Sequence, residues 1–164
     1  MKYYGRIWLF LLALLPGSAL ALSAGEPAPA FTLPDSAGKS VSLASLRGQF
    51  VYVDFWASWC GPCRQSFPWM NQLSRRARKA SLQVVAINVD ENSGDAAAFL
   101  RQLPASFTVL YDPAGQVAAS YQLPGMPTSF LIGPDGRVRW THIGFRPGDG
   151  QFIEAMILRE MRKP

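Results

Sequence analysis

The chain has 164 residues, of which 49% are hydrophobic and 12% aromatic, so it can bury one ordinary core and is too apolar to be intrinsically disordered. Its 16 Lys and Arg residues outnumber its 11 Asp and Glu residues, for a formal net charge of +5. Much of this excess lies at 75–79, late in a predicted helix, without a groove-reading motif or an aromatic stacking platform. It therefore indicates a solvated basic face, and nucleic acid is not an expected partner.

The first 21 residues have the pattern of a secretory signal. Lys2 and Arg6 precede an apolar run over 7–15, and Ala19-Leu20-Ala21 provides the small residues of a cleavage site after Ala21. Because a membrane span needs ~20 apolar residues, we expect cleavage, with a retained membrane anchor as the alternative. Removal leaves 14 basic and 11 acidic residues, a net charge of +3, and export predicts a periplasmic location.

The mature part begins with a Pro/Ala-rich segment at 22–30, which predicts a flexible leader before a domain over 31–164. Residues 31–43 predict a β-hairpin that turns at 36–38. The apolar run 49–56 predicts a buried central strand.

Beyond this strand the pattern alternates between helices and strands. The expected elements are a helix over 63–80 with a kink at Pro68, a strand over 82–90, a helix over 95–103, a strand over 107–112, a short helix over 116–123, a β-hairpin of 128–132 with 137–143, and an amphipathic helix over 149–162. This order predicts an α/β domain with a central mixed sheet flanked by helices.

The only two cysteines, Cys60 and Cys63, lie where the predicted strand meets the next helix. Residues at i and i+3 of a helix are close enough for a disulfide after a small adjustment. A bridge that closes so short a loop removes little chain entropy and is a weak structural staple. The spacing therefore favours a reversible redox pair.

The two sulfur atoms are expected to differ. Cys60 lies at the helix N-terminus, where unpaired N–H groups and the helix dipole lower a thiol pKa, so we expect an exposed, readily ionised thiolate that attacks a substrate disulfide. Cys63 lies inside the helix and is expected to resolve the mixed disulfide. Asp54, an acid in an apolar run, is the candidate proton acceptor; the alternative is a solvated residue at a strand edge.

The segment "VDFWASWCGPCR" resembles the active site of thioredoxin. Together with "FTLPDSAGKSVSLASLRGQF" before it and "GMPTSFLI" after an extra helix and strand, it resembles the TlpA/ResA-type exported thioredoxin-like proteins from about residue 27 onward. The resemblance implies a thioredoxin fold with an N-terminal β-hairpin and a central helix–strand insertion.

The resemblance also implies roles for individual residues. Cys60 is the attacking cysteine, Cys63 the resolving cysteine and Asp54 the buried acid. The substrate-binding residues that it implies are Trp59 beside the cysteines, Gly61 and Pro62 between them, and Met126 and Pro127 in a cis-proline turn whose backbone pairs with the incoming peptide.

Two positions depart from the related proteins. Ser66 stands where many ResA-type proteins have Glu, which weakens the transfer of a cytochrome c maturation role. Ala86 stands where thioredoxin has Lys, so Asp54 lacks a cationic neighbour and its pKa is expected to be strongly raised.

The sequence thus predicts an exported thiol–disulfide oxidoreductase that reduces disulfides in periplasmic client proteins, with cytochrome c maturation as one candidate role. The Gly-Pro dipeptide implies a reductant by resemblance, and a membrane thiol donor of the DsbD/CcdA kind would resupply electrons. We expect a monomer without a cofactor or a resident metal.

Three alternatives differ in chemistry. A disulfide oxidase or isomerase would have the same fold but reverse the direction of the thiol–disulfide exchange. A copper carrier would use the two thiolates, with His142 as the only histidine, although an ordinary strand position fits His142 better. Peroxidase chemistry is disfavoured because the chain lacks a Pro-x-x-x-Thr-x-x-Cys run.

Overall fold

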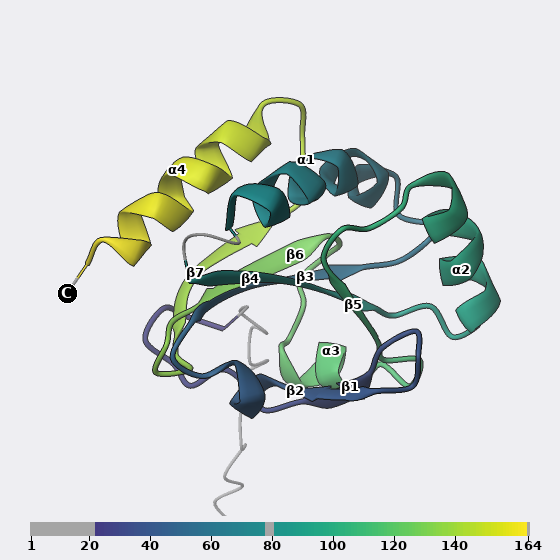
Figure 1. Ribbon diagram of the computed structural model, residues 1–164, viewed down its shortest axis with the longest axis horizontal. Coiled ribbons are helices and arrows are strands. Elements are labelled where there is room, and N and C mark those ends of the chain that lie inside the picture. The colour runs from purple at the N-terminus through teal and green to yellow at the C-terminus, as the bar shows by residue number, and fades with distance from the viewer. Residues whose placement is uncertain (1–21, 78–80, 164) are drawn as a thin grey trace, which may run out of the picture.

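A five-stranded sheet in the order β5-β4-β3-β6-β7 forms the centre of the computed structural model, which describes residues 22–77 and 81–163 (Figure 1). The predicted signal at 1–21 lies outside the described residues. Among the described helices, none has the length and apolar character that crossing a membrane requires.

The sheet is mixed, as predicted. Its central strand β3 pairs in parallel with β4 and antiparallel with β6, while β5 and β7 form the two edges. The strands are β3 (Phe50–Trp56), β4 (Leu82–Asn88), β5 (Thr108–Tyr111), β6 (Thr128–Ile132) and β7 (Val138–Ile143).

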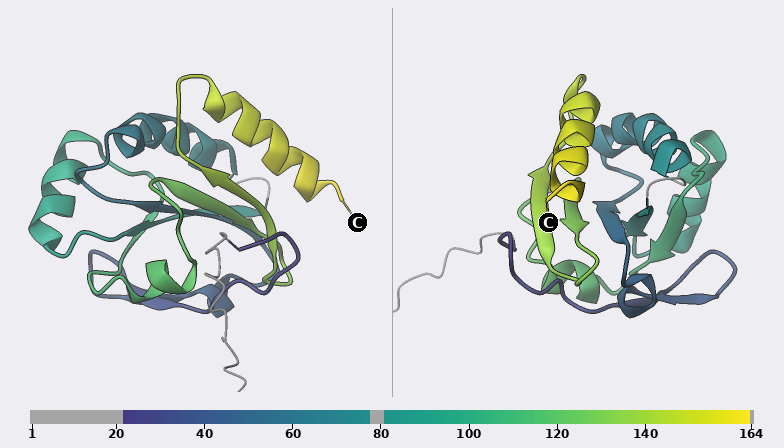
Figure 2. Two further views of the ribbon diagram at one scale, coloured as in Figure 1. Left: turned by 180° about the vertical axis from the view of Figure 1, so that it is seen from behind. Right: turned by 60° about the vertical axis from the view of Figure 1, so that its left-hand side comes forward.

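Helices cover the sheet from both sides. Figures 1 and 2 show α1 and α4 side by side over one face, with α3 and the small N-terminal hairpin below the other. The bounds are α1 (Gly61–Ala77), α2 (Ser93–Gln102), α3 (Gln116–Ser120) and α4 (Asp149–Met161), with a hairpin of β1 (Thr32–Pro34) and β2 (Ser40–Ser42) and a 3-10 turn η1 (Leu43–Leu46). Every predicted element is present, with ends that differ by a few residues.

Helix α1 begins at Gly61, two residues earlier than predicted. Pro62 falls in its first turn, where backbone N–H groups have no intrahelical partner, so the missing N–H costs no hydrogen bond. Pro68 lies inside α1 as expected, and the kink proposed there stays a prediction.

Alternate residues of β3 enter two different cores. Val51, Val53 and Phe55 pack in the cluster that includes Phe31, Tyr121 and Phe130. Tyr52 and Trp56 point the other way and pack with Phe67 and Met70 of α1 and with Ile153 and Ile157 of α4, among others. The second cluster also contains both cysteines.

The segment 22–30 makes a turn around 24–26, closed by a hydrogen bond from the N–H of Glu26 to the carbonyl of Ser23 over 3.2 Å, and further backbone hydrogen bonds attach it to the sheet. The N–H of Gly25 donates to the carbonyl of Val138 over 2.8 Å, and the N–H of Val138 donates to Glu26 over 2.9 Å. Pro27 forms a bridge with Arg137. The described part of the predicted leader is therefore held along the start of β7 rather than free of it.

Candidate active site

Cys60 and Cys63 lie where β3 passes into α1. β3 ends at Trp56, a three-residue loop follows, and Cys60 is the last residue before α1. The two cysteines form a disulfide with their Cα atoms 5.3 Å apart. The structure therefore brings them together as the spacing predicted.

The two cysteines differ in their surroundings. The N–H of Cys63 points to Sγ of Cys60 over 3.2 Å, a contact that favours negative charge on the Cys60 sulfur. Cys63 is completely buried, as expected for the resolving cysteine, and Ser66 donates its hydroxyl to the Cys63 carbonyl over 3.0 Å. The expected exposure of Cys60 is wrong for the disulfide form, because only 4% of the residue is accessible.

Exposed residues surround this covered disulfide. Trp59 is 72% exposed, and Gly61 and Pro62 also lie at the surface. The edge of the site is therefore open at Trp59, Gly61 and Pro62, while both cysteines are enclosed in the disulfide form.

Asp54 lies in the middle of β3, on the face covered by α1, and is 1% exposed. The alternative of a solvated acid at a strand edge is therefore wrong. Burial raises the pKa of Asp54 to about 7, and a hydrogen bond from the Ser129 hydroxyl to Oδ1, 2.6 Å long, opposes this rise. The strongly raised pKa expected for Asp54 is confirmed.

The strands next to Asp54 explain this environment. Ala86 of β4 stands directly opposite Asp54, as expected from the missing lysine, and Ser129 of β6 stands opposite on the other side. Tyr52 is two residues earlier on the same face, and burial together with the Asp54 charge raises its pKa well above the ordinary value.

The turn before β6 reaches the same region. The peptide bond between Met126 and Pro127 is cis, as the resemblance implied. Met126 packs against the core cluster that contains both cysteines, and Pro127 accepts a hydrogen bond from the N–H of Gly144 over 2.7 Å. The turn therefore borders the same core cluster as the disulfide and is anchored by the residue that follows β7.

His142 is a strand residue of β7, as expected. Its ring stacks on Trp140 with 5.3 Å between the ring centroids, and Nε2 lies 3.6 Å from Oδ2 of Asp149. Within 22–77 and 81–163 no group of three or more His, Cys, Asp and Glu side chains is placed to hold a metal ion.

Sequence reasoning missed a polar clamp on the loop before Cys60. The carboxylate of Asp90 accepts hydrogen bonds from both the N–H and the hydroxyl of Ser58, at 3.0–3.1 Å, and from the side chain of Asn88 at 2.8 Å. The "NVD" at the end of β4 contained the only signal, polar residues directly after a buried strand. Its partner is 32 residues away, so the spacing could not reveal the contact.

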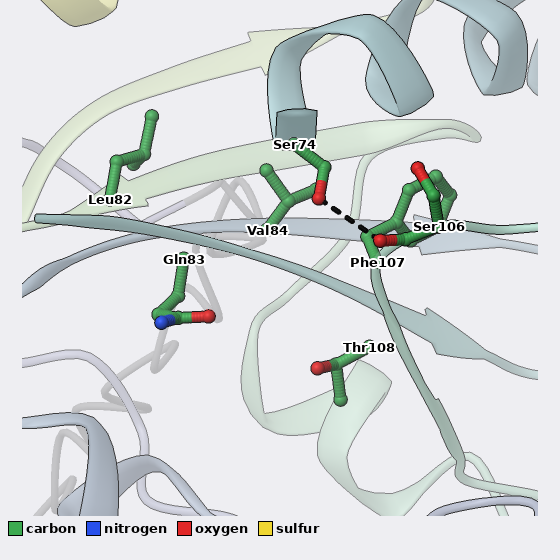
Figure 3. Close-up of a pocket in the computed structure, with 7 residues that line it drawn as sticks. All are labelled: Ser74, Leu82, Gln83, Val84, Ser106, Phe107 and Thr108. Atoms are coloured by element: carbon green, nitrogen blue, oxygen red, sulfur yellow. Dashed lines mark hydrogen bonds between the residues drawn. The ribbon is translucent and has the colours of Figure 1, made fainter. Parts of the chain in front are cut away.

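Two cavities lie at opposite ends of the sheet. A cavity of about 250 Å³ beside Ser74, Leu82 and Phe107 is at the end of β4 remote from the cysteines, and its lining contains neither a cysteine nor an ionisable group (Figure 3). A second cavity of about 220 Å³ is lined by Ser58 and Arg64, next to the disulfide, and by α2. Chemistry and proximity both favour the second cavity as part of the site.

Comparisons with known proteins agree with this geometry. The AhpC/TSA family model matches residues 24–141. The thiol-disulfide oxidoreductase ResA of Bacillus subtilis (strain 168) is 36% identical over 118 residues, which are 72% of this chain and 66% of that protein. The chain thus spans just under two thirds of that relative's length.

Solved structures are similar over more of the chain. A Chlorobium tepidum protein, provisionally assigned as thiol:disulfide interchange protein DsbE, is 52% identical with a TM-score of 0.82, over 86% of this chain and 99% of the other. The thioredoxin domain of a thiol-disulfide oxidoreductase from Bacteroides vulgatus is 25% identical with a TM-score of 0.74, over 84% and 99%. The fold is therefore a thioredoxin fold, as predicted.

Proposed function

The chain belongs to the AhpC/TSA family, and we propose that it is a thiol–disulfide oxidoreductase whose Cys60–Cys63 pair exchanges with disulfides in client proteins. One observation carries the proposal: the two cysteines form a disulfide at the start of α1, in the same core cluster as the strand that carries the buried Asp54. The oxidoreductases among the similar proteins support the same chemistry.

The reaction begins with the reduced protein. The Cys60 thiolate attacks one sulfur of a client disulfide, which forms a Cys60–client bond and releases the other client sulfur as a thiolate. Cys63 then attacks the Cys60 sulfur, which forms the Cys60–Cys63 disulfide and releases the second client thiolate. Two electrons pass to the client, and each released thiolate takes up a proton.

Asp54 is the proposed base for the second step. Cys63 must lose its proton before it attacks, and it is buried away from solvent. A carboxyl whose pKa burial raises to about 7 can accept this proton near neutral pH and return it later. Its place on the face covered by α1 supports the role.

Clients are proposed to bind around the exposed rim of the disulfide. Trp59 provides an apolar contact, and the backbone before Pro127 can pair with an extended client segment. Gly61 and Pro62 lie at the surface without bulky side chains that would block this approach. The cavity beside Ser58 and Arg64 can take a client side chain.

The proposal includes the direction of electron flow and the cellular compartment. We propose that an exported form acts as a monomeric reductant in the periplasm, resupplied by a membrane dithiol donor of the DsbD/CcdA kind. Client proteins with reducible disulfides are the substrates, and apocytochrome c is one candidate. Ser66, in place of the glutamate common in ResA-type proteins, argues against a narrow cytochrome c role.

Trapping tests the proposal directly. In Cys63→Ala the mixed disulfide on Cys60 cannot be resolved, so we expect clients to remain covalently attached until a reductant is added. Cys60→Ala is the matched control and should trap nothing. Equal trapping by both variants, or insulin reduction unaffected in Cys60→Ala, would overturn the proposed function.

Redox equilibration with glutathione distinguishes the alternatives. A reductant should hold its Cys60–Cys63 disulfide at a potential well below that of the glutathione pool. An oxidase or isomerase should equilibrate at a higher potential. Stoichiometric copper retained on the purified reduced protein would instead favour a carrier.

A further inference from the structure

The two carboxyl oxygens of Asp54 have different surroundings. Oδ1 accepts the hydroxyl proton of Ser129 over 2.6 Å, the shortest contact between two side chains in the buried part of the sheet described here. Oδ2 is buried and has no hydrogen-bond partner among the described residues. A buried carboxyl oxygen without a partner is costly, which suggests that this atom has a use in another state of the molecule.

The sheet places few other polar groups around this carboxyl. Ala86, Asp54 and Ser129 stand side by side on adjacent strands, and His142 follows one strand further, opposite Ser129. Tyr52, on the same strand and face, is the titratable group that interacts with the Asp54 charge. The cysteines lie where β3 passes into α1, in the core cluster that packs on this face of β3. His142 is beyond Ser129 and faces Asp149.

Within the described residues, Ser129 is consequently the one side chain that hydrogen-bonds to the Asp54 carboxyl. Burial raises the pKa of Asp54 and the Ser129 hydroxyl lowers it, with no contribution from a charged neighbour in the described part of the chain. The lysine of thioredoxin is missing here, and among the described residues it is the neutral hydroxyl of Ser129 that stabilises the carboxylate. Sequence reasoning did not identify this residue, because Ser129 is 75 positions from Asp54.

We propose that Ser129 is a positioning residue for disulfide exchange: its hydroxyl fixes Oδ1 of Asp54 and leaves Oδ2 as the atom that takes the Cys63 proton. This inference rests on the proposed function. In the resolving step the Cys63 proton passes to Oδ2, the Cys63 thiolate attacks Cys60, and the client leaves as a thiolate. Ser129 keeps its own proton and gives up none of its hydrogen bond.

A single-turnover assay tests the inference. Thionitrobenzoate is attached to Cys60 of the reduced protein as a mixed disulfide, and its coloured release reports the attack by Cys63. The rate is measured against pH in wild type, Ser129→Ala and Ser129→Thr, and the Asp54 carboxyl is titrated by carbon NMR in the reduced proteins.

Ser129→Ala removes a hydrogen bond to the charged Asp54 carboxylate, so the midpoint of the Asp54 titration should rise by about one pH unit. Release of thionitrobenzoate should then be about tenfold slower below neutral pH. Release at high pH should match wild type. Ser129→Thr keeps the hydroxyl and should restore the wild-type midpoint. Ser66→Ala removes a buried hydroxyl that bonds to Cys63 rather than to Asp54, so the Asp54 titration should stay in place.

Each outcome decides one of the two proposals. An unchanged midpoint in Ser129→Ala, or a threonine variant that behaves like alanine, overturns the role of Ser129. A wild-type protein that never releases thionitrobenzoate overturns the proposed function itself. If the alanine variant fails to fold, Ser129→Thr and Ser129→Val give the same test, since they have similar shapes and differ in the hydroxyl.

Discussion

The two faces of β3 are equally buried and chemically opposite. Val51, Val53 and Phe55 point into a core cluster of hydrophobic residues and carry no polar side-chain atoms themselves. Tyr52 and Asp54 point to the other face, where they carry buried polar atoms beneath α1. The alternation of a single strand thus places all buried polar side chains of β3 on one face, which also packs a hydrophobic core.

The two faces of β3 contribute differently to the free energy of folding. On the apolar face every buried side chain removes surface from water, which favours folding. On the reactive face Asp54 keeps one oxygen unpaired, and burial raises its pKa to about 7. The buried Asp54 carboxyl therefore opposes folding near neutral pH, and it also provides a proton acceptor. Substitutions on the two faces should therefore have different consequences for stability and for thiol exchange.

The largest expected effect is on the reactive side. Cys60→Ser removes the attacking sulfur, and insulin reduction should fall by a factor of about 10³ or more, because a hydroxyl is not ionised at neutral pH. The folded fraction should hardly change, since the short disulfide loop contributes little chain entropy. Residual activity within tenfold of wild type would contradict the assignment.

On the apolar face the expected effect is on stability alone. Phe55→Ala removes a completely buried ring that contacts Tyr121 and Phe130, with centroids 5.0 and 6.0 Å away. Urea unfolding should show a loss of about 3–5 kcal/mol. The pH profile of thiol exchange in the folded variant should match wild type, and a shifted profile would mean that the two faces are not independent.

Asp54→Asn should increase stability above neutral pH, whereas Phe55→Ala should decrease it. The pKa rises from an ordinary value of 3.8 to about 7 on folding, so between these pH values the native state holds a proton that the unfolded state has lost. Wild-type stability therefore falls as pH increases from about 4 to about 7, by at most about 4 kcal/mol. Asparagine does not titrate, and the variant should unfold at higher urea concentration than wild type at pH 8.

The same variant should also lose the base. Resolution of the mixed disulfide should slow about 10²-fold at pH 7. The stability difference from wild type should be much smaller at pH 4, where both side chains are neutral. A difference that is independent of pH would show that Asp54 does not titrate in this range.

A smaller effect is expected at the clamp on the loop before Cys60. Asp90→Ala leaves the N–H of Ser58 and the side chain of Asn88 without their partner, which should cost about 2 kcal/mol. Hydrogen exchange at Ser58 and Trp59 should accelerate. Asp90→Asn retains one acceptor oxygen and should lie between the alanine variant and wild type.

The smallest effect on stability is expected at the rim. Trp59 is 72% exposed, so Trp59→Ala should change the free energy of unfolding by less than about 0.5 kcal/mol. The KM for protein disulfides should increase, while reaction with a small disulfide should stay the same. An equal loss with both substrates would assign Trp59 to the chemistry rather than to binding.

Much of this architecture follows from local patterns. The continuous apolar run at 49–56, the helical spacing after Cys63 and the turn residues around 133–136 predicted the elements, since each signal lies within a few residues. The cysteine pair and the acid in the apolar run were also visible in this way, whereas the missing lysine followed from the resemblance to thioredoxin.

The features that could not be predicted depend on distant parts of the chain. Ser129 and Asp90 contact residues 75 and 32 positions away, and only the strand register brings them together. Cys60 is buried in a core cluster that draws residues from several elements, and local spacing does not report such burial. The hydrogen bonds of 25–28 with β7 have the same origin.

The N-terminal segment also determines which backbone groups of the two edge strands, β5 and β7, are free to pair with another chain. Residues 25–28 occupy the backbone groups at the start of β7, and Asp35 forms a bridge with Leu110 on the opposite border strand, β5. Unpaired border strands are sites where further chains add themselves and aggregate. The segment 25–35 contacts both edge strands, β7 and β5, and therefore hinders the addition of further strands to the sheet. It leaves the end of the sheet that carries the disulfide free for short-lived contacts with client proteins.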